Sequence, residues 1–518
     1  MAAVFQAPKF NATEWASLYA RAGARYAGPV AEHADGFAMF KSAISHWNAA
    51  EMGPKRDIVG ELAQEIRAQG LRLVTTMHHQ WLFAWYPTWD SETDAGDPKY
   101  ELTADQGGLY GPKTGNSKCF GGSLSTLASP THPPGCEVSQ RFNDYFVGKV
   151  REVVDQYQPD VLYFDAKMDW IDEPHRLDFL THYYNSALAW KKDVIVTYKM
   201  KDLAVGSAAL DFERGGSDKV LPLKWQTDDA VDRGSWSWVD PPNLKNETEL
   251  INELVDIVSK NGNLLLDIPP HADGSIDPAI QRTLTAMGDW LKVNGEGIFA
   301  TKPWADGPYG EGPTKISQGS FHEWPIFTAS DFRFTQNAKA LFATAMAWSS
   351  DGSFVIKSFN STKGAGKRIT SLSLLGSTEK VSFKLQPDGM HIAALQKPQS
   401  PGPAYVFRAH LDDSAVGFLA WDRNDPVQAG KRNTLRWLTG AAAGDESGSA
   451  VAIERWTPAA GWEAVQGGAS VPNSGSFVWA APRELDAPPL LRVRALGQGE
   501  EGVEHIAQMM LASDRRRQ

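Results

Sequence analysis

The chain has 518 residues, which is long enough for a barrel of roughly 250 residues together with smaller domains. Its net charge of -11 argues against nucleic acid or an anionic membrane surface as a partner, and the basic residues 515–517 are expected to form a solvated end. No apolar run approaches the roughly 20 residues that a membrane span requires. Composition therefore leaves a chain with a sizeable core and at least two domains.

No targeting segment is visible at the start, where Met1 leads to Pro8 without a basic segment followed by an apolar stretch. The location stays open, and a secreted or periplasmic full-length protein is one of the options. Cys119 and Cys136 are the only cysteines, and both lie in one loop region rich in Gly, Pro and Ser. Two cysteines do not decide between a disulfide and free thiols. No metal-ligand constellation accompanies them, and we expect no cofactor.

Helix and strand patterns alternate along the first 300 residues. Helical patterns occur at about 13–23, 58–69, 138–157, 177–191, 245–260 and 278–293, and β-rich runs at about 25–31, 71–77, 161–165, 194–198, 208–213, 223–227 and 264–268. Strands that alternate with helices indicate an α/β fold with a parallel sheet, most simply a (β/α)8 TIM-like barrel. Only seven strand runs appear and the first element is a helix, so we expect the first barrel strand to lie before Met1.

After Trp304 the pattern changes to short alternating segments separated by Gly-rich turns, which predict antiparallel β-sandwiches. The expected strands lie at 340–348, 353–357, 381–385 and 405–408, and further on at 434–437, 451–455 and 475–479. We expect a catalytic barrel at 1–305, a β-sandwich at 306–412, an immunoglobulin-like β-sandwich module at 413–500 and a tail at 501–518. The loop from about 82 to 137 is expected on the active face of the barrel.

Two predicted strands end in carboxylates. The segment Asp160-Val-Leu-Tyr-Phe-Asp165 runs from a strand to an acid, and the run at 208–213 ends in Glu213. In a (β/α)8 barrel the C-terminal ends of the strands carry the chemistry. One strand-end Asp and one strand-end Glu, in a chain with 19 tryptophans, suggest glycoside hydrolysis, because that reaction uses two carboxyl groups and flat aromatic rings suit the C–H faces of sugars.

Many ordered motifs resemble those of the α-L-fucosidases of glycoside hydrolase family 29. They are Glu32-His33-Ala34-Asp35-Gly36-Phe37, Trp47-Asn48, residues 53–62, residues 160–165, Trp225-Gln226-Thr227, residues 260–270 and residues 290–296, and residues 371–377 look like part of the sandwich that follows the barrel. The likeness covers about residues 10–410. It implies a retaining, exo-acting enzyme that releases terminal fucose from a fucosylated oligosaccharide or glycoconjugate.

The resemblance implies that Asp165 is the nucleophile, whose carboxylate attacks the anomeric carbon. The structural alternative is a strand-end Asp that caps the next helix. The acid/base is harder to assign, because its position varies within the family. Of the glutamates between Asp165 and the helix near residue 246, Glu173 and Glu213, only Glu213 ends a strand, and it is our choice. Its alternative role is a salt bridge with a neighbour such as Arg214.

Two further observations bear on the acid/base. Many relatives carry a Glu where this chain has Gln226, and an amide cannot donate a proton as an acid. A general acid must hold its proton near neutrality, so we expect burial and the charge of Asp165 to raise the pKa of Glu213. If Glu213 faces away from the barrel interior, Glu247 and Glu249 become the next candidates.

The sugar contacts follow from the same resemblance. His33 resembles the first His of the motif His-His-Asp-Gly-Phe, which hydrogen-bonds sugar hydroxyls, and the second His is Ala34 in this chain. His78 and His79 are candidates to restore such donors, and Trp81 is expected to pack against the fucose methyl. The remaining candidates, each with a packing or structural role as its alternative, are Trp47, Arg214 and Trp225. Asp35 and Asp57 are expected to be caps rather than catalysts.

Two classes of function remain after this reading. The first is a retaining exo-α-L-fucosidase. The second is a fucose-binding or catalytically impaired relative, because the first strand and the second His of the motif are missing. The sequence does not reveal the linkage preference or the oligomeric state.

Overall fold

The structure of the chain is a computed structural model. It describes residues 5–88, 90–101, 110, 138–204, 206–304, 307–314, 324–337, 340–361, 369–398, 402–411, 419–421, 427–439, 450–457, 461–472, 476–482, 490–496 and 504–508. Cys119 and Cys136 lie outside the described residues, as does most of the loop expected at 82–137, so the disulfide question stays open. No helix in the described ranges is both long enough and apolar enough to cross a membrane.

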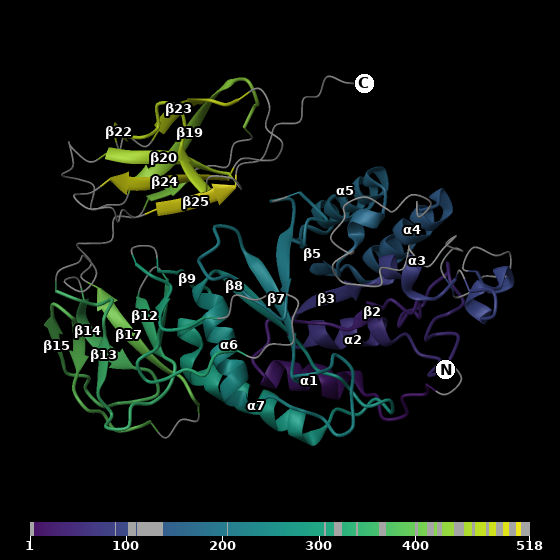
Figure 1. The fold of residues 1–518 in the computed structure, drawn as a ribbon, viewed down its shortest axis with the longest axis horizontal. Coiled ribbons are helices and arrows are strands. Elements are labelled where there is room, and N and C mark those ends of the chain that lie inside the picture. Colours follow the sequence, from purple (N-terminus) through teal and green to yellow (C-terminus); the bar gives the residue numbers. More distant parts are fainter. Residues whose placement is uncertain are drawn as a thin grey trace.

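A curled parallel sheet forms the centre of the N-terminal region (Figure 1). Its strands are β1 (Tyr26–Ala27), β2 (Val30–Glu32), β3 (Arg72–Met77), β4 (Val161–Phe164), β5 (Ile195–Lys199), β6 (Ala209–Glu213), β7 (Trp225–Ala230) and β8 (Gly262–Asp267). They pair in the order β1, β3, β4, β5, β6, β7, β8, and β2 also pairs with β3. The prediction of a TIM-like parallel sheet is confirmed.

Within the described residues, β1 and β8 form the two ends of this sheet. Strand β1 pairs with β3, and β8 pairs with β7. The hydroxyl of Tyr26 in β1 donates a hydrogen bond to the carbonyl oxygen of Leu264 in β8 across 2.6 Å. The sheet therefore curls far enough for its two ends to meet through a side chain.

The first strand run, predicted as one strand at 25–31, forms two short strands instead. Pro29 has no N–H to give to a ladder. Gly28 lies so close to β3 that a Cβ at this position would be 1.7 Å from the carbonyl oxygen of Val74. Both β1 and β2 pair with β3, so they are one strand interrupted at these two residues.

Helices pack around the outer face of the sheet (Figure 1). They are α1 (Ala12–Arg21), α2 (Ile58–Ala68), α4 (Gln140–Tyr157), α5 (Glu173–Trp190), α6 (Glu247–Ser259) and α7 (Pro278–Asn294), with a short α3 (Leu82–Trp85) after β3. Their starts follow the expected capping chemistry. Asp57 accepts from the amide of Gly60 at the start of α2, which confirms its predicted capping role, and Asn246 and Glu249 form a capping box at α6.

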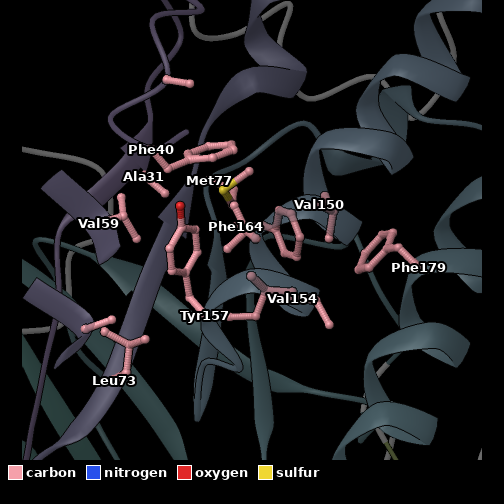
Figure 2. Close-up of a cluster of buried hydrophobic side chains, with 14 of the residues drawn as sticks. Ala31, Phe40, Val59, Leu73, Met77, Val150, Val154, Tyr157, Phe164 and Phe179 are labelled. Carbon is pink, nitrogen blue, oxygen red and sulfur yellow. The ribbon is translucent and has the colours of Figure 1, made fainter. Parts of the chain in front are cut away.

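The alternation of side chains along the strands builds the main core. Phe164 of β4 and Met77 of β3 point outward, where Figure 2 shows them beside Val150 of α4 and Phe179 of α5. All four side chains are buried. Because neighbouring strand residues point to opposite faces, the residues on either side of these two point into the barrel.

The two C-terminal regions are antiparallel. The first contains β9 (Lys302–Pro303), β10 (Gly310–Glu311), β11 (Phe332–Gln336), β12 (Leu341–Ala345), β13 (Phe354–Ile356), β14 (Ile369–Leu374), β15 (Phe383–Gln386), β16 (Gly389–Ile392) and β17 (Tyr405–Leu411). The second contains β18 (Leu419–Trp421), β19 (Arg432–Thr439), β20 (Ala450–Thr457), β21 (Gly461–Ala464), β22 (Val471–Pro472), β23 (Ser476–Ala480), β24 (Leu490–Leu496) and β25 (Glu504–Gln508). The second region has a buried cluster of its own, which includes Leu435, Ile453 and Trp479.

Candidate active site

The C-terminal ends of β4, β5 and β6 bring charged side chains into the barrel. Asp165 follows β4, Lys199 ends β5 and Glu213 ends β6. Each lies at an even spacing from an inward residue of its own strand, so all three share the inner face. The parallel register places these strand ends side by side.

Lys199 is the centre of this group. Its Nζ lies 3.0 Å from Oδ1 of Asp165, 3.1 Å from Oε2 of Glu213 and 3.1 Å from Oδ2 of Asp228, which belongs to β7. The Lys199 side chain is 5% exposed. An ammonium has three N–H donors, and here three carboxylates surround it. Burial lowers the pKa of Lys199, but these carboxylates raise it well above its usual range. Lys199 is therefore charged at neutral pH.

Asp165 is held ionised in this setting. Burial raises the pKa of its carboxyl group, but the charge of Lys199, followed by that of His78, lowers it to about 2, with help from hydrogen bonds of Lys199 and of the Ala166 backbone. The other carboxylate oxygen, Oδ2, accepts a hydrogen bond from the indole Nε1 of Trp81 across 2.7 Å. An ionised carboxylate with a defined orientation is the state that a nucleophile requires.

The pKa of Glu213 is shifted in the opposite direction from that of Asp165. Burial, followed by the charges of Asp228 and Asp165, raises the pKa of Glu213, and Lys199 opposes this shift. Its side chain is 40% exposed and is thus open to a ligand from the mouth of the barrel. Because Lys199 Nζ lies 3.0 Å from an oxygen of Asp165 and 3.1 Å from one of Glu213, the two oxygens are at most 6.1 Å apart, the sum of these distances.

A histidine pair lies beside Asp165 at the mouth of the barrel. The ring centroids of His33 and His78 are 4.5 Å apart, and those of His33 and Trp85 are 6.2 Å apart with nearly perpendicular rings. His33 is exposed and His78 is half-buried. Burial lowers the pKa of His78 to about 3, against the opposing charge of Asp165, so its imidazole is neutral at pH 7 and has one N–H to donate. The structure brings these residues together with Trp81 near Asp165, and their contact with a sugar stays a prediction.

Two predicted sugar ligands lie on the other face of the sheet, and we correct their assignment. The ring of His79 stacks on Phe146 of α4 at 4.5 Å and is fully buried. Trp225 is 1% exposed and donates its Nε1–H to the carbonyl oxygen of Lys260 at 2.8 Å. Each is one residue away from an inward position, and a shift of one residue reverses the face of a strand.

For Arg214 and Trp47, the predicted contact with the sugar stays a prediction. The Arg214 guanidinium is buried, lies 3.4 Å from Asp229, and donates to the carbonyl oxygens of Asp232, Arg233 and Ser235. Arg214 therefore fixes a loop that follows β7. Trp47 is half-buried, and its carbonyl oxygen accepts from the amide of Ala38.

The alternative candidates for the acid/base, Glu247 and Glu249, lie in the first turn of α6. Glu249 contributes to the capping box of α6 and pairs with Arg233 at 2.5 Å. Glu247 is the first residue of α6, on the outer side of the sheet. The predicted capping role of Asp35 is supported by a hydrogen bond that its side chain accepts from the amide of Phe37. Glu213 alone of the proposed glutamates lies beside Asp165.

Sequence reasoning missed Lys199, Tyr163 and Asp228. Asp228 accepts from both Lys199 Nζ and the Tyr163 hydroxyl, each across 3.1 Å. The predicted strand at 194–198 stopped one residue before Lys199, and the predicted strand at 223–227 stopped one residue before Asp228. If each predicted strand is extended by one residue, the alternation of side chains places Lys199 and Asp228 on the inner face. This alternation is the sequence signal that could have identified them.

The comparison with known families agrees with this geometry. A family model described as "Alpha-L-fucosidase" matches residues 1–296, which is more than half of the chain.

This chain belongs to the α-L-fucosidase family.

Individual α-L-fucosidases resemble the chain over most of its length. It is 28% identical over 414 residues to the tissue alpha-L-fucosidase of Rattus norvegicus, a match that covers 77% of this chain and 74% of that protein. It is 29% identical over 309 residues to the plasma alpha-L-fucosidase of Homo sapiens, which covers 58% of this chain and 57% of that protein. Both matches extend the family relationship to curated enzymes.

A solved structure supports the fold. The Thermotoga maritima alpha-fucosidase in complex with a mechanism-based inhibitor has a TM-score of 0.58 and 24% sequence identity, and the match covers 79% of this chain and 81% of that chain. The α-L-fucosidase family model ends at residue 296, so it covers the curled sheet and its helices. The two antiparallel regions lie beyond it.

Proposed function

We propose that this chain is a retaining, exo-acting α-L-fucosidase, which hydrolyses terminal α-linked L-fucose from a fucosylated oligosaccharide or glycoconjugate. Asp165 acts as the nucleophile and Glu213 as the acid/base. The family membership supports the substrate class, and the geometry of the two carboxyl groups supports their roles.

The contact of both carboxylates with Lys199 Nζ carries this proposal. It limits the distance between the two oxygens to 6.1 Å. Retaining enzymes place their carboxyl groups about 5 to 5.5 Å apart, and inverting enzymes about 6.5 to 9.5 Å apart, because inversion needs room for a water molecule. The limit applies to this one pair of oxygens, and it is compatible with the spacing of a retaining enzyme.

The opposite pKa shifts of the two acids fit a division of roles. The pKa of Asp165 is lowered to about 2, so Asp165 is a carboxylate over the whole neutral range. The pKa of Glu213 is raised, which favours the protonated form that a general acid needs. Two carboxyl groups whose environments push their pKa values apart are the usual basis for an acid and nucleophile pair.

The reaction proceeds in two steps. First, the carboxylate of Asp165 forms a bond to the anomeric carbon while the glycosidic C–O bond breaks, and Glu213 gives its proton to the departing oxygen. Second, the Glu213 carboxylate takes a proton from water, whose oxygen bonds to the anomeric carbon as the bond to Asp165 breaks. Each step inverts the anomeric centre, so the product has the configuration of the substrate.

An NMR assay of the first-formed anomer tests the proposal. With an aryl α-L-fucoside as substrate, we expect α-L-fucose to appear before mutarotation produces the β anomer. β-L-Fucose as the first product would contradict the retaining mechanism. Binding of L-fucose without turnover of the aryl fucoside or of a panel of fucosylated oligosaccharides would instead identify a fucose-binding or catalytically impaired relative.

A further inference from the structure

Beneath Lys199, two further acids lie side by side in the barrel interior. Asp228 Oδ2 accepts hydrogen bonds from Lys199 Nζ and from the hydroxyl of Tyr163, each across 3.1 Å. Asp211 Oδ2 accepts from Nε2 of Gln226 across 2.7 Å. Asp211 and Asp228 are 3% and 8% exposed. One carboxylate oxygen of each acid therefore accepts hydrogen bonds from other side chains.

The other oxygen of each acid has no such donor. Oδ1 of Asp211 and Oδ1 of Asp228 are both buried, and no N–H or O–H donor of the described residues reaches them. Both side chains come from the inner face of the neighbouring strands β6 and β7, where Asp211 pairs with Gln226, two residues before Asp228. Two ionised carboxylates are acceptors only, so neither of these buried oxygens can satisfy the other unless one of the two acids carries a proton. Like charges in contact also cannot both ionise readily.

We propose that Asp211 and Asp228 share one proton and together act as positioning residues, which fix Lys199 between Asp165 and Glu213. This inference rests on the proposed function of the site. Neither acid contacts the reacting atoms. Their effect on the reaction passes through the ammonium group of Lys199.

The hydrogen-bond geometry explains how the pair positions Lys199. The side chain of a lysine is a flexible stem with a rotating ammonium group, and its orientation is set by its partners. Asp228 takes one of the three N–H donors, which leaves the other two for Asp165 and Glu213. The Tyr163 hydroxyl fixes the orientation of the Asp228 oxygen in turn. Without this support, one N–H of Lys199 would lack a partner in a buried site.

Other groups around the pair agree with a shared proton. Burial, followed by the charge and hydrogen bond of Asp228, raises the pKa of Asp211 well above its usual range, and Lys199 opposes this shift. The titratable groups around the pair are Tyr26 of β1, Tyr163 of β4, Asp165 just after β4, Lys199 of β5, Glu213 of β6 and Asp267 of β8. Of these, Lys199 is the cation, so a second negative charge on the pair would lack a counterion.

The substitutions Asp211→Asn and Asp211→Leu test the positioning role. The amide of the Asn variant has an N–H that can replace the shared proton and an oxygen that can accept from Gln226. The Leu variant has neither. We expect kcat to fall by roughly 10- to 100-fold in Asp211→Leu, since a misplacement of about 1 Å costs on the order of 100-fold. The Asn variant should recover at least about tenfold of that loss, and KM should change less than kcat.

The double variant Asp211→Asn/Asp228→Asn removes the remaining negative charge while keeping the shape of the pair. We expect its kcat to be about tenfold or more below that of Asp211→Asn, with both variants folded by circular dichroism. Equal activity of the double variant and Asp211→Asn would overturn the positioning role. Equal loss in Asp211→Asn and Asp211→Leu would overturn the shared proton, because the amide reproduces only the protonated acid.

An infrared difference spectrum gives a readout that does not depend on activity. At pH 7, the spectrum of the unchanged protein minus that of Asp211→Asn should contain the carbonyl band of a protonated carboxylic acid. If this band is absent, the proton is not shared, whether or not the protein hydrolyses fucosides. If the band is present but no fucoside is turned over, the proposed function fails and the shared proton stands.

Discussion

Trp81 donates its indole N–H to Oδ2 of Asp165, while Lys199 binds Oδ1 of the same carboxylate. Both oxygens of Asp165 therefore have a donor of their own, one neutral and one charged. A carboxylate held in this way keeps a fixed orientation and a low pKa. The predictions below follow from this arrangement and from the charges around it.

Removing the carboxylate of Asp165 should abolish the first chemical step. We expect Asp165→Asn to reduce kcat on an aryl α-L-fucoside by several orders of magnitude, because an amide does not form the glycosyl-enzyme bond. In Asp165→Ala, added azide should restore part of the rate and produce a fucosyl azide of inverted configuration, which NMR identifies. Near-normal turnover by a folded Asp165→Asn variant would show that the assignment is wrong.

Glu213→Gln should remove the proton donor. For a natural glycan with a poor leaving group we expect kcat/KM to fall by about 10²- to 10⁴-fold, the usual contribution of a general acid, and by less for an activated aryl fucoside. In the unchanged protein kcat/KM should fall as pH rises through the raised pKa of Glu213, because the acid form is lost. This basic limb should disappear in Glu213→Gln. Glu173→Gln, at the exposed start of α5, is the matched control and should keep the limb.

Lys199→Met should move the acidic limb of the pH profile of kcat/KM. Lys199 lowers the pKa of Asp165, whose value of about 2 keeps the nucleophile ionised down to strongly acidic pH. Without the ammonium this pKa rises, so the ionised form is lost at a higher pH. We expect the acidic limb of kcat/KM to shift upward, and Lys199→Arg to shift it less because the charge is kept. An unmoved limb in a folded Lys199→Met variant would contradict the role assigned to the lysine.

Asp267 should make the protein less stable as pH rises toward neutrality. Burial, with the charge of Asp228, raises the pKa of Asp267 to about 7, while in the unfolded chain it lies near 3.9. A raised pKa means that the folded state binds the proton more strongly, so this contribution is full below about pH 4 and lost as pH rises through about 7. The change in Tm that Asp267→Asn causes, relative to the unchanged protein, should therefore be more favourable at pH 8 than at pH 5. Asp289→Asn, at a side chain that is 45% exposed, is the control, and an equal change in both variants would contradict the prediction.

Deleting residues from about 416 onward should leave activity on a small aryl fucoside within a few-fold of the parent. The described strands of this region form their own buried cluster around Leu435, Ile453 and Trp479. The candidate catalytic residues all lie in the parallel sheet. Steady-state kinetics on the folded deletion variant checks this. Complete loss of activity would show that the C-terminal region completes the active site.

The strand ends could be predicted from the sequence because they depend on local patterns. The alternating runs fixed the position of β4 and β6, and their acidic ends pointed to Asp165 and Glu213. The interruption of the first strand was also within reach, since Pro29 cannot donate to a ladder. The sequence separates the two carboxylates by 48 positions, and only the assumption of a parallel sheet brought them together.

The contacts between strands could not be predicted in the same way. The register that places Lys199 opposite Asp211 and Glu213 opposite Asp228 is a property of the assembled sheet. For the same reason the sequence did not separate His78 from His79. Adjacent residues at a strand end point to opposite faces, and without the register both histidines are equally consistent with a sugar contact.

The hydrogen bond from Tyr26 to Leu264 joins the two ends of the curled sheet through one hydroxyl group. Two paired strands are held together by many backbone hydrogen bonds, whereas a single side-chain hydrogen bond can break without disturbing its neighbours. Local opening of the sheet should therefore begin between β1 and β8. In amide hydrogen exchange, the outer edges of these two strands should lose protection well before β4, β5 and β6, whose backbones are paired on both sides.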